Sequence, residues 1–192
     1  MPRPSPETLA FLSSRRSRPA KTLGPPIPAR EALLPLLQIA LRSPDHGKLE
    51  PWRLIVLERA ALQRLGRLAA VRGDALGREP ADIEKQGSHF SNAHLAVAVI
   101  ACPVPSEKIP RIEQTLSAGA VCMQLLNAAL AAGWGANWLS GWASHDSGFA
   151  AEGLGLDEGE WIAGLIHIGT ESSAPPERPR PDPERAITWM TE

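Results

Sequence analysis

The sequence predicts one domain that mixes helices with strands, as an α/β or an α+β fold. Apolar runs at 52–58, 95–102 and 161–169 are rich in β-branched residues, and helical patterns separate them. The chain has 192 residues, of which 43% are hydrophobic. This is long enough to bury a core and short for two domains. Three strands do not by themselves give the order of a sheet.

The first part of the chain predicts two helices joined by an extended connector. Ser-Pro-Glu places an N-cap residue before a proline at the first helical position, so a short helix is expected over 5–12. It would lead the run Arg15-Arg16-Ser17 into a loop. Prolines at 19, 25, 26 and 28 favour an extended connector. Leucines then cover most of a helix over 31–42, which we expect to be buried in a core or between subunits, with Pro35 bending its first turns.

The middle of the chain predicts two more helices around a buried strand. The first, over 60–77, carries arginines on its outer face. Residues 79–92 are polar without a clear period, so their structure stays open, a mobile lid being one alternative. The strand 95–102 is uniformly apolar and stops at prolines. An alanine- and leucine-rich helix from 110 to 132 then closes at Gly133 and is the candidate central helix.

The last part predicts a loop, a short helix, a strand and a tail. Residues 134–147 hold three tryptophans at four-residue spacing, but glycines interrupt them, so we expect a loop with aromatic corners that suits a stacking pocket. After the strand 161–169, prolines are too frequent for a packed element. We therefore expect a domain over 1–171 and a proline-rich C-terminal tail over 172–192 that is a loose end rather than an arm over a partner.

Composition excludes several classes of protein. The net charge is −1, without the basic excess of a nucleic-acid-binding or membrane-surface protein. No apolar run approaches the ~18 residues that cross a bilayer, and the N-terminus lacks the apolar core of a signal peptide. Cys102 and Cys122 lie in apolar runs, as buried thiols do. We expect a cytoplasmic protein in a reducing compartment.

Two short runs carry the chemistry. Arg15-Arg16-Ser17 offers paired guanidiniums and a hydroxyl, which match phosphate oxygens, although a solvated surface pair would look the same. In the second run, Pro44-Asp45-His46-Gly47, turn-forming residues hold a carboxylate and an imidazole on a tight bend, under which we expect Trp52 to pack. A zinc hydrolase built on that carboxylate and imidazole is a weak rival, because the other histidines lack metal-ligand spacing.

Four segments together resemble the nitroreductase family. They are Arg15-Arg16-Ser17 with the following Pro-Ala-Lys-Thr-Leu, then Ser-Pro-Asp-His-Gly-Lys-Leu-Glu-Pro-Trp-Arg at 43–53, Gly-Trp-Gly-Ala-Asn-Trp-Leu-Ser-Gly at 133–141, and Gly-Leu-Ile-His-Ile-Gly-Thr at 164–170. More narrowly, the sequence is similar to the small, minimal-length branch in which Pro-Asp-His replaces a Ser/Asn pattern. The resemblance spans roughly residues 7 to 170 in order and spacing.

The resemblance implies a fold, an assembly and a site. The fold would be α+β and nitroreductase-like, with a central, mostly antiparallel sheet flanked by helices, in a homodimer that binds FMN at the subunit interface. Arg15, Arg16 and Ser17 would hold the FMN phosphate and ribityl chain, with Arg42 and His46 reaching in from the partner subunit. The residues bordering the flavin would be Trp138, Leu139, Ser140 and Gly141.

The activity implied is that of an FMN-dependent NAD(P)H oxidoreductase. NADH or NADPH would reduce the flavin, and a nitroaromatic, a quinone or a similar small molecule would reoxidise it in a ping-pong sequence. No protein side chain is expected to act as a catalytic acid or nucleophile, and no metal is expected. A non-catalytic flavin carrier or sensor remains the alternative, because it would use the same contacts.

Overall fold

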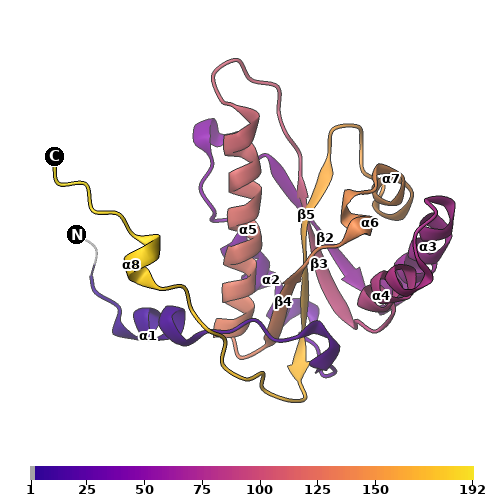
Figure 1. Ribbon diagram of the computed structural model, residues 1–192, viewed down its shortest axis with the longest axis horizontal. Coiled ribbons are helices and arrows are strands. Elements are labelled where there is room, and N and C mark those ends of the chain that lie inside the picture. The colour runs from indigo at the N-terminus through magenta and orange to yellow at the C-terminus, as the bar shows by residue number, and fades with distance from the viewer. Residues whose placement is uncertain (1–2) are drawn as a thin grey trace.

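The computed structural model describes residues 3–192 and confirms the mixed fold, with five strands in one sheet and helices on both of its faces (Figure 1). In chain order the elements are α1 (Pro6–Ser14), the 3-10 turn η1 (Ala20–Thr22), β1 (Leu23–Gly24), α2 (Arg30–Ala40), the 3-10 turn η2 (His46–Lys48), β2 (Trp52–Glu58), α3 (Arg59–Ala75), α4 (Pro80–Ser91), β3 (Leu95–Ala101), α5 (Arg111–Ala131), β4 (Gly135–Leu139), α6 (Trp142–His145), α7 (Ser147–Leu154), β5 (Trp161–Glu171) and α8 (Pro183–Ala186).

The sheet has the order β1-β5-β3-β2, and every pairing in it is antiparallel. The 11-residue β5 is its central strand. Its residues 165–167 pair with β3 and also with β4, so β4 must lie along the opposite edge of β5 from β3. The expected α+β architecture is therefore confirmed, and β4 joins the sheet only through β5.

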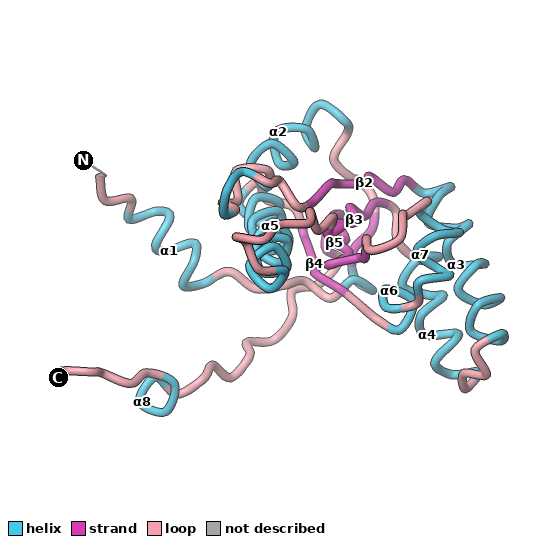
Figure 2. Tube along the Cα trace, turned by 90° about the horizontal axis from the view of Figure 1, so that it is seen from above, coloured by secondary structure: helices cyan, strands magenta, loops and turns pink. Residues whose placement is uncertain are grey.

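Two helical layers cover the sheet (Figure 2). The helices α2 and α5 pack on one face, while α3, α4, α6 and α7 lie on the other. All seven residues of β3 are buried, because alternate side chains enter the two layers. Val97 and Val99 face α5, and Ala98 and Ile100 face α3. Burial on both faces explains why this strand is uniformly apolar in the sequence.

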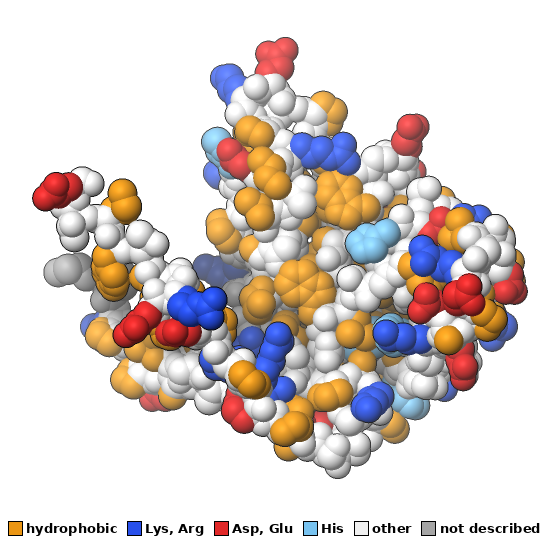
Figure 3. All heavy atoms as spheres, in the orientation of Figure 1, with side chains coloured by type: hydrophobic (Ala, Val, Ile, Leu, Met, Phe, Trp, Pro, Cys, Tyr) orange, Lys and Arg blue, Asp and Glu red, His pale blue; other side chains and the backbone are white. Residues whose placement is uncertain are grey.

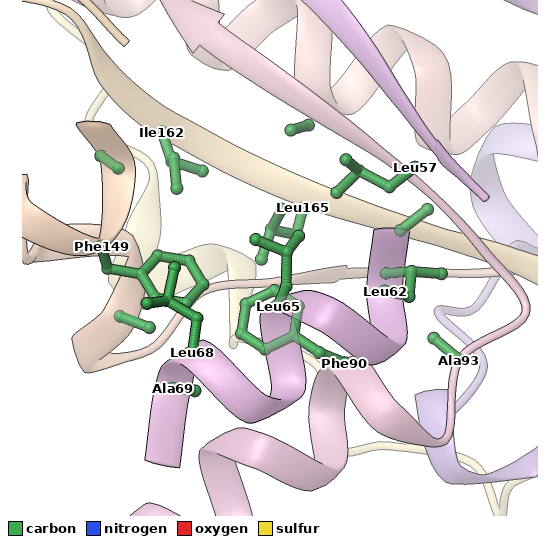
Figure 4. Packing of buried hydrophobic residues seen from close by; sticks show 14 of the residues in the cluster. Leu57, Leu62, Leu65, Leu68, Ala69, Phe90, Ala93, Phe149, Ile162 and Leu165 are labelled. Carbon is green, nitrogen blue, oxygen red and sulfur yellow. The ribbon is translucent and has the colours of Figure 1, made fainter. Parts of the chain in front are cut away.

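The core beneath α3 is built around aromatic and leucine side chains (Figure 4). Leu62 and Leu65 project from α3 toward Leu165 of β5, and Phe90 of α4 meets Phe149 of α7 with ring centroids 5.2 Å apart. Tilted aromatic pairs of this kind add to the apolar area buried. This cluster fixes α4 and α7 against the sheet.

Most of the expected elements are confirmed to within a few residues. The strand 52–58 is found as expected, and α2 continues through Pro35. Residues 79–92, whose structure the sequence left open, form α4 rather than an irregular lid. Only Gln86 and Phe90 of this helix are buried, so its apolar period is too weak to recognise.

One expectation for a loop is wrong, because residues 134–147 contain β4 and α6. The proline-rich connector, expected to be extended, contains the short strand β1. A side chain at Gly135 would come within 2.5 Å of Leu23, and Ala136 is fully buried beside α5. Close packing and pairing with β5 therefore impose extended structure on a segment whose glycines and tryptophans suggested a turn-rich loop.

The helix α1 and the tail (residues 172–192) extend from the same side of the body (Figures 1 and 2). The first part of the tail contacts the body, because Arg16 donates a hydrogen bond to the carbonyl of Pro176. The proline rings prevent regular hydrogen bonding in the tail but not contact through its carbonyls and charged side chains.

Both cysteines are free thiols. Burial raises the pKa of Cys122 to about 12, and Cys102 reaches the same value through desolvation together with its hydrogen bond to Glu160. Cys122 is buried as expected, whereas Cys102 is only partly buried. Within residues 3–192, no helix combines the length and hydropathy needed to cross a membrane.

Candidate functional site

The first candidate run follows α1 directly, as expected, and we call residues 15–18 the arginine loop. Arg18 fastens the loop to β4: its backbone N–H donates to Ala136 at 2.8 Å, and its carbonyl accepts from the amide of Asn137 at 2.7 Å. The Arg18 guanidinium also lies 3.3 Å from the carboxylate of Glu171 at the end of β5. The arginine loop is therefore held at one edge of the sheet, beside β4.

Positive charge in the arginine loop exceeds the acceptors available to it. Arg15 donates one hydrogen bond, of 3.3 Å, to the hydroxyl of Ser17. The buried Nε of Arg15 has no acceptor within residues 3–192. Desolvation lowers the pKa of Arg15, and the neighbouring charges of Arg180 and Arg16 lower it further. A buried donor without a partner, among like charges, fits a bound anion such as phosphate.

The flavin-bordering segment predicted from the resemblance lies on β4 and just after it. The Trp138 side chain is partly buried and packs against the core beneath α5. Leu139 and Gly141 are half-buried, and Ser140 is exposed. Because Arg18 pairs with the start of β4, the structure brings the arginine loop and this segment to neighbouring parts of one edge.

The second candidate run forms a tight turn that includes η2. Gly47 has φ 75°, as its position on the bend requires, and Lys48 and Glu50 also have positive φ. The carboxylate of Asp45 accepts from the backbone N–H of Glu50 at 3.1 Å, which closes the turn. His46 is 61% exposed, and its Nδ1 lies 2.7 Å from the carboxylate of Glu113.

Trp52 supports this turn from below, as the sequence predicts. Its indole N–H donates to the Ser117 hydroxyl at 3.0 Å, and that hydroxyl donates to the carbonyl of Pro44 at 2.9 Å. Arg42 lies between the end of α2 and this turn in the sequence, and its side chain is exposed. The turn is thus fixed to β2 and α5, while Arg42 and His46 remain available at the surface.

A single chain keeps the two halves of the predicted site apart. The His46 turn contacts Glu113 in the first turn of α5, whereas the arginine loop pairs with β4, which follows the end of α5. A helix of 21 residues is about 30 Å long, comparable with the diameter of a small domain. Figure 1 shows the 3-10 turn η2 and the segment after α1 near opposite ends of α5. One small cofactor cannot contact both within one chain.

Sequence reasoning missed a polar group on α4. Gln86 is only 4% exposed, and a side chain at Gly141 would come within 2.0 Å of its Oε1. The amide of Gln86 therefore lies directly against the backbone at Gly141. His89 stands one turn further on the same helix, with a buried Nδ1 that lacks a partner within residues 3–192. Gln86 and His89 are three residues apart, a spacing that places two side chains on the same face of a helix, and this spacing can be seen in the sequence.

His167 of β5 lies near His89 and is a further buried polar side chain. It pairs in register with Asn137 of β4 and is almost fully buried. Desolvation, together with the nearby His89, lowers the pKa of His167 to about 4. Its Nε2 has no partner among the described residues. The imidazole is therefore neutral near pH 7.

Comparisons with known proteins agree with this geometry. The model of the nitroreductase family matches residues 12–170. The protein "Putative NAD(P)H nitroreductase YdjA" of Escherichia coli strain K12 is 33% identical over 185 residues, which cover 96% of this chain and 100% of that protein.

Solved structures share the fold at lower identity. A nitroreductase-like family protein from Bacillus cereus has a TM-score of 0.76 and 23% identity, with 100% of both chains covered. A variant of NfnB, an FMN and NADPH-dependent nitroreductase from Sphigopyxis sp. strain HMH, has a TM-score of 0.74 and 17% identity, covering 96% and 99% of the chains. With the family model matching most of its length, this chain belongs to the nitroreductase family, a family of oxidoreductases.

Proposed function

We propose that this protein is an FMN-dependent NAD(P)H oxidoreductase, with the FMN phosphate bound by the arginine loop. The observation that carries the proposal is the buried Nε of Arg15, which lacks an acceptor while Arg16 and Arg180 crowd it with positive charge. A phosphate dianion would satisfy that donor and relieve the repulsion. NfnB, which shares the fold, is described as FMN and NADPH-dependent, in agreement with this assignment.

The chain offers groups suited to each part of the cofactor. Arg15, Arg16 and Ser17 would hold the phosphate and the adjoining ribityl hydroxyls with charge-assisted hydrogen bonds. The backbone at Leu139–Gly141 would border the ring, and the amide of Gln86, which lies against Gly141, would donate to or accept from its polar edge. Trp138 would contribute through its backbone, because its side chain is already packed in the core.

The protein's part in the reaction is position and electrostatics. Bound FMN supplies the redox chemistry, accepting hydride from NADH or NADPH and passing electrons to a nitroaromatic, a quinone or a similar acceptor. Hydrogen-bond donors beside the ring edge would favour the more negatively charged reduced form. We expect donor and acceptor to use the same open face in turn, which gives ping-pong kinetics.

We further propose that the active form is a homodimer with FMN at the subunit interface. Large apolar side chains of α1, α2 and α5 are exposed in one chain, where they would otherwise face water; they are Leu9, Leu12, Leu34, Ile39, Ile112, Leu116 and Met123. A groove of about 690 Å³ runs between the same three helices. A second copy covering them would let Arg42 and His46 of the partner subunit approach the cofactor that one chain leaves half-surrounded.

The visible spectrum of the purified protein tests the proposal. We expect a flavin spectrum, or uptake of added FMN. Under anaerobic conditions the colour should bleach with NADPH or NADH and return with a nitroaromatic or a quinone.

Each alternative has its own result in this experiment. A flavin spectrum that persists under both nicotinamides would favour the non-catalytic carrier or sensor. A colourless protein that does not bind FMN would contradict the assignment of the cofactor. A monomer that binds FMN with full affinity would contradict the shared site.

A further inference from the structure

The tail brings a carboxylate to the arginine loop. Arg16 donates a hydrogen bond to the Pro176 carbonyl, and its guanidinium lies 3.7 Å from the carboxylate of Glu177. The same carboxylate accepts from Arg180 at 3.0 Å and from the backbone N–H of Arg178 at 2.9 Å. Figure 3 shows acidic and basic side chains close together along the tail where it approaches the body. Glu177 therefore lies between one arginine of the loop and one of the tail.

Two guanidiniums, those of Arg16 and Arg180, lie against the carboxylate of Glu177, and the guanidinium of Arg15 lies near both of them. Arg180 is close enough to Arg15 to lower the pKa of that residue, as Arg16 also does. The carboxylate of Glu177 has a lowered pKa, because it accepts from the Arg178 N–H and lies near Arg180 and Arg16. It is therefore ionised at neutral pH, and it is the acidic group that this cluster holds.

We propose that Glu177, which lies against Arg16 of the arginine loop and beside the unsatisfied Arg15, competes with the phosphate of FMN for these arginines, so that this residue of the tail lowers the affinity for the cofactor. The inference rests on the proposed function, because it takes the arginine loop as the phosphate site. It deepens that function by assigning a role to a segment outside the sheet.

Physical considerations favour exchange of the two anions. A phosphate monoester carries about −1.5 to −2 charges and three acceptor oxygens at pH 7, whereas a carboxylate carries one charge. The side chain of Glu177 is 71% exposed, so moving it away removes little packing. With Glu177 in place, an incoming phosphate must break its contacts with Arg16 and approach a like charge.

The test compares FMN with riboflavin, which lacks the phosphate, by titrating each flavin into the cofactor-free full-length protein and following its fluorescence. We expect Glu177→Gln to bind FMN about two- to fivefold more tightly, the range that corresponds to an exposed ion pair. Riboflavin affinity should not change. The gain in FMN affinity should shrink as salt is added, because screening weakens both the attraction of Glu177 to the arginines and its repulsion of the phosphate.

Glu184→Gln is the matched control. It removes the same charge from the tail, and Glu184 makes no side-chain contact with the arginines within the described residues. We expect it to bind FMN as the unmodified protein does. Thermal melts of both variants should coincide with that of the unmodified protein, since both side chains are exposed.

The outcomes separate this inference from the proposed function. If the unmodified protein prefers FMN to riboflavin but Glu177→Gln binds FMN no more tightly, Glu177 does not compete and the inference is wrong. An equal gain in Glu184→Gln would also overturn it, by showing a general effect of charge. If the unmodified protein binds the two flavins equally, the phosphate assignment itself fails.

Discussion

Arginines of two other segments lie beside the two ends of β5, and they are in opposite situations. At the start of the strand, Arg53 donates two hydrogen bonds of 2.8 Å to the carboxylate of Glu160, which also accepts from Cys102 at 3.0 Å. In the arginine loop near the end of the strand, the guanidinium of Arg15 donates to the hydroxyl of Ser17, its Nε has no acceptor within residues 3–192, and Arg16 and Arg180 lie nearby. The carboxylate raises the pKa of Arg53, whereas desolvation and like charge lower that of Arg15.

The difference separates an arginine that is satisfied within the fold, Arg53, from one that we propose binds the FMN phosphate, Arg15. A guanidinium paired bidentately with a carboxylate is satisfied within the fold and has little left to offer a ligand. A guanidinium that is partly desolvated and short of acceptors retains an unfavourable desolvation free energy, which an anionic ligand can offset by accepting its hydrogen bonds. The acceptors around each guanidinium therefore distinguish the two arginines.

The largest expected effect is on cofactor binding by Arg15. Arg15→Gln should weaken FMN affinity about tenfold to a hundredfold, since hydrogen bonds to charged groups are worth about 1.5–3 kcal/mol. Flavin fluorescence titration measures the change. Arg53→Gln is the control and should leave FMN affinity unchanged. Equal losses in the two variants would remove the distinction between the two ends.

The paired end should respond in stability instead. Glu160→Gln should lower the free energy of unfolding by about 1–2 kcal/mol, a value reduced for the solvent that reaches Arg53. Denaturant unfolding measures it. Arg53→Gln should lower the free energy of unfolding by a similar amount. The double variant should lower it by less than the sum of the two single-variant losses. Strict additivity would show that the two side chains do not stabilise the fold as a pair.

The same pair predicts a dependence on pH. The hydrogen bond from Arg53 lowers the pKa of Glu160 to about 2, against an ordinary value of 4.5. Because the folded-state value is depressed, the stabilisation is complete above pH 4.5 and is lost as the pH falls toward 2. Between pH 4.5 and pH 2, the free energy of unfolding of Glu160→Gln should change less steeply with pH than that of the unmodified protein. Parallel curves would contradict the assignment.

The smallest expected effect sharpens the description of the arginine loop. Ser17→Ala removes the one hydroxyl that Arg15 contacts, and should weaken FMN binding about two- to tenfold, as for one neutral hydrogen bond. Riboflavin titration distinguishes the part of the cofactor involved. A loss for FMN alone places Ser17 at the phosphate, and an equal loss for riboflavin places it at the ribityl chain.

The sequence by itself determined the main helices, three strands and the family. These features depend on local and periodic information: the uniformly apolar run of β3, the alanine- and leucine-rich α5, and the short motifs around Arg15 and His46. The positive φ of Gly47 was also predictable, because turn residues specify it. Such signals lie within a few residues of the feature that they predict.

Only the tertiary structure decided how these parts meet. β4 is a strand because β5 pairs with it and close packing at Gly135 excludes a side chain, although its own glycines and tryptophans suggest a loop. Gln86 reaches Gly141 through the packing of α4, and Pro176 reaches Arg16 across 160 residues of chain. Contacts between distant segments leave no period in the sequence, since they depend on how whole elements pack rather than on neighbouring residues.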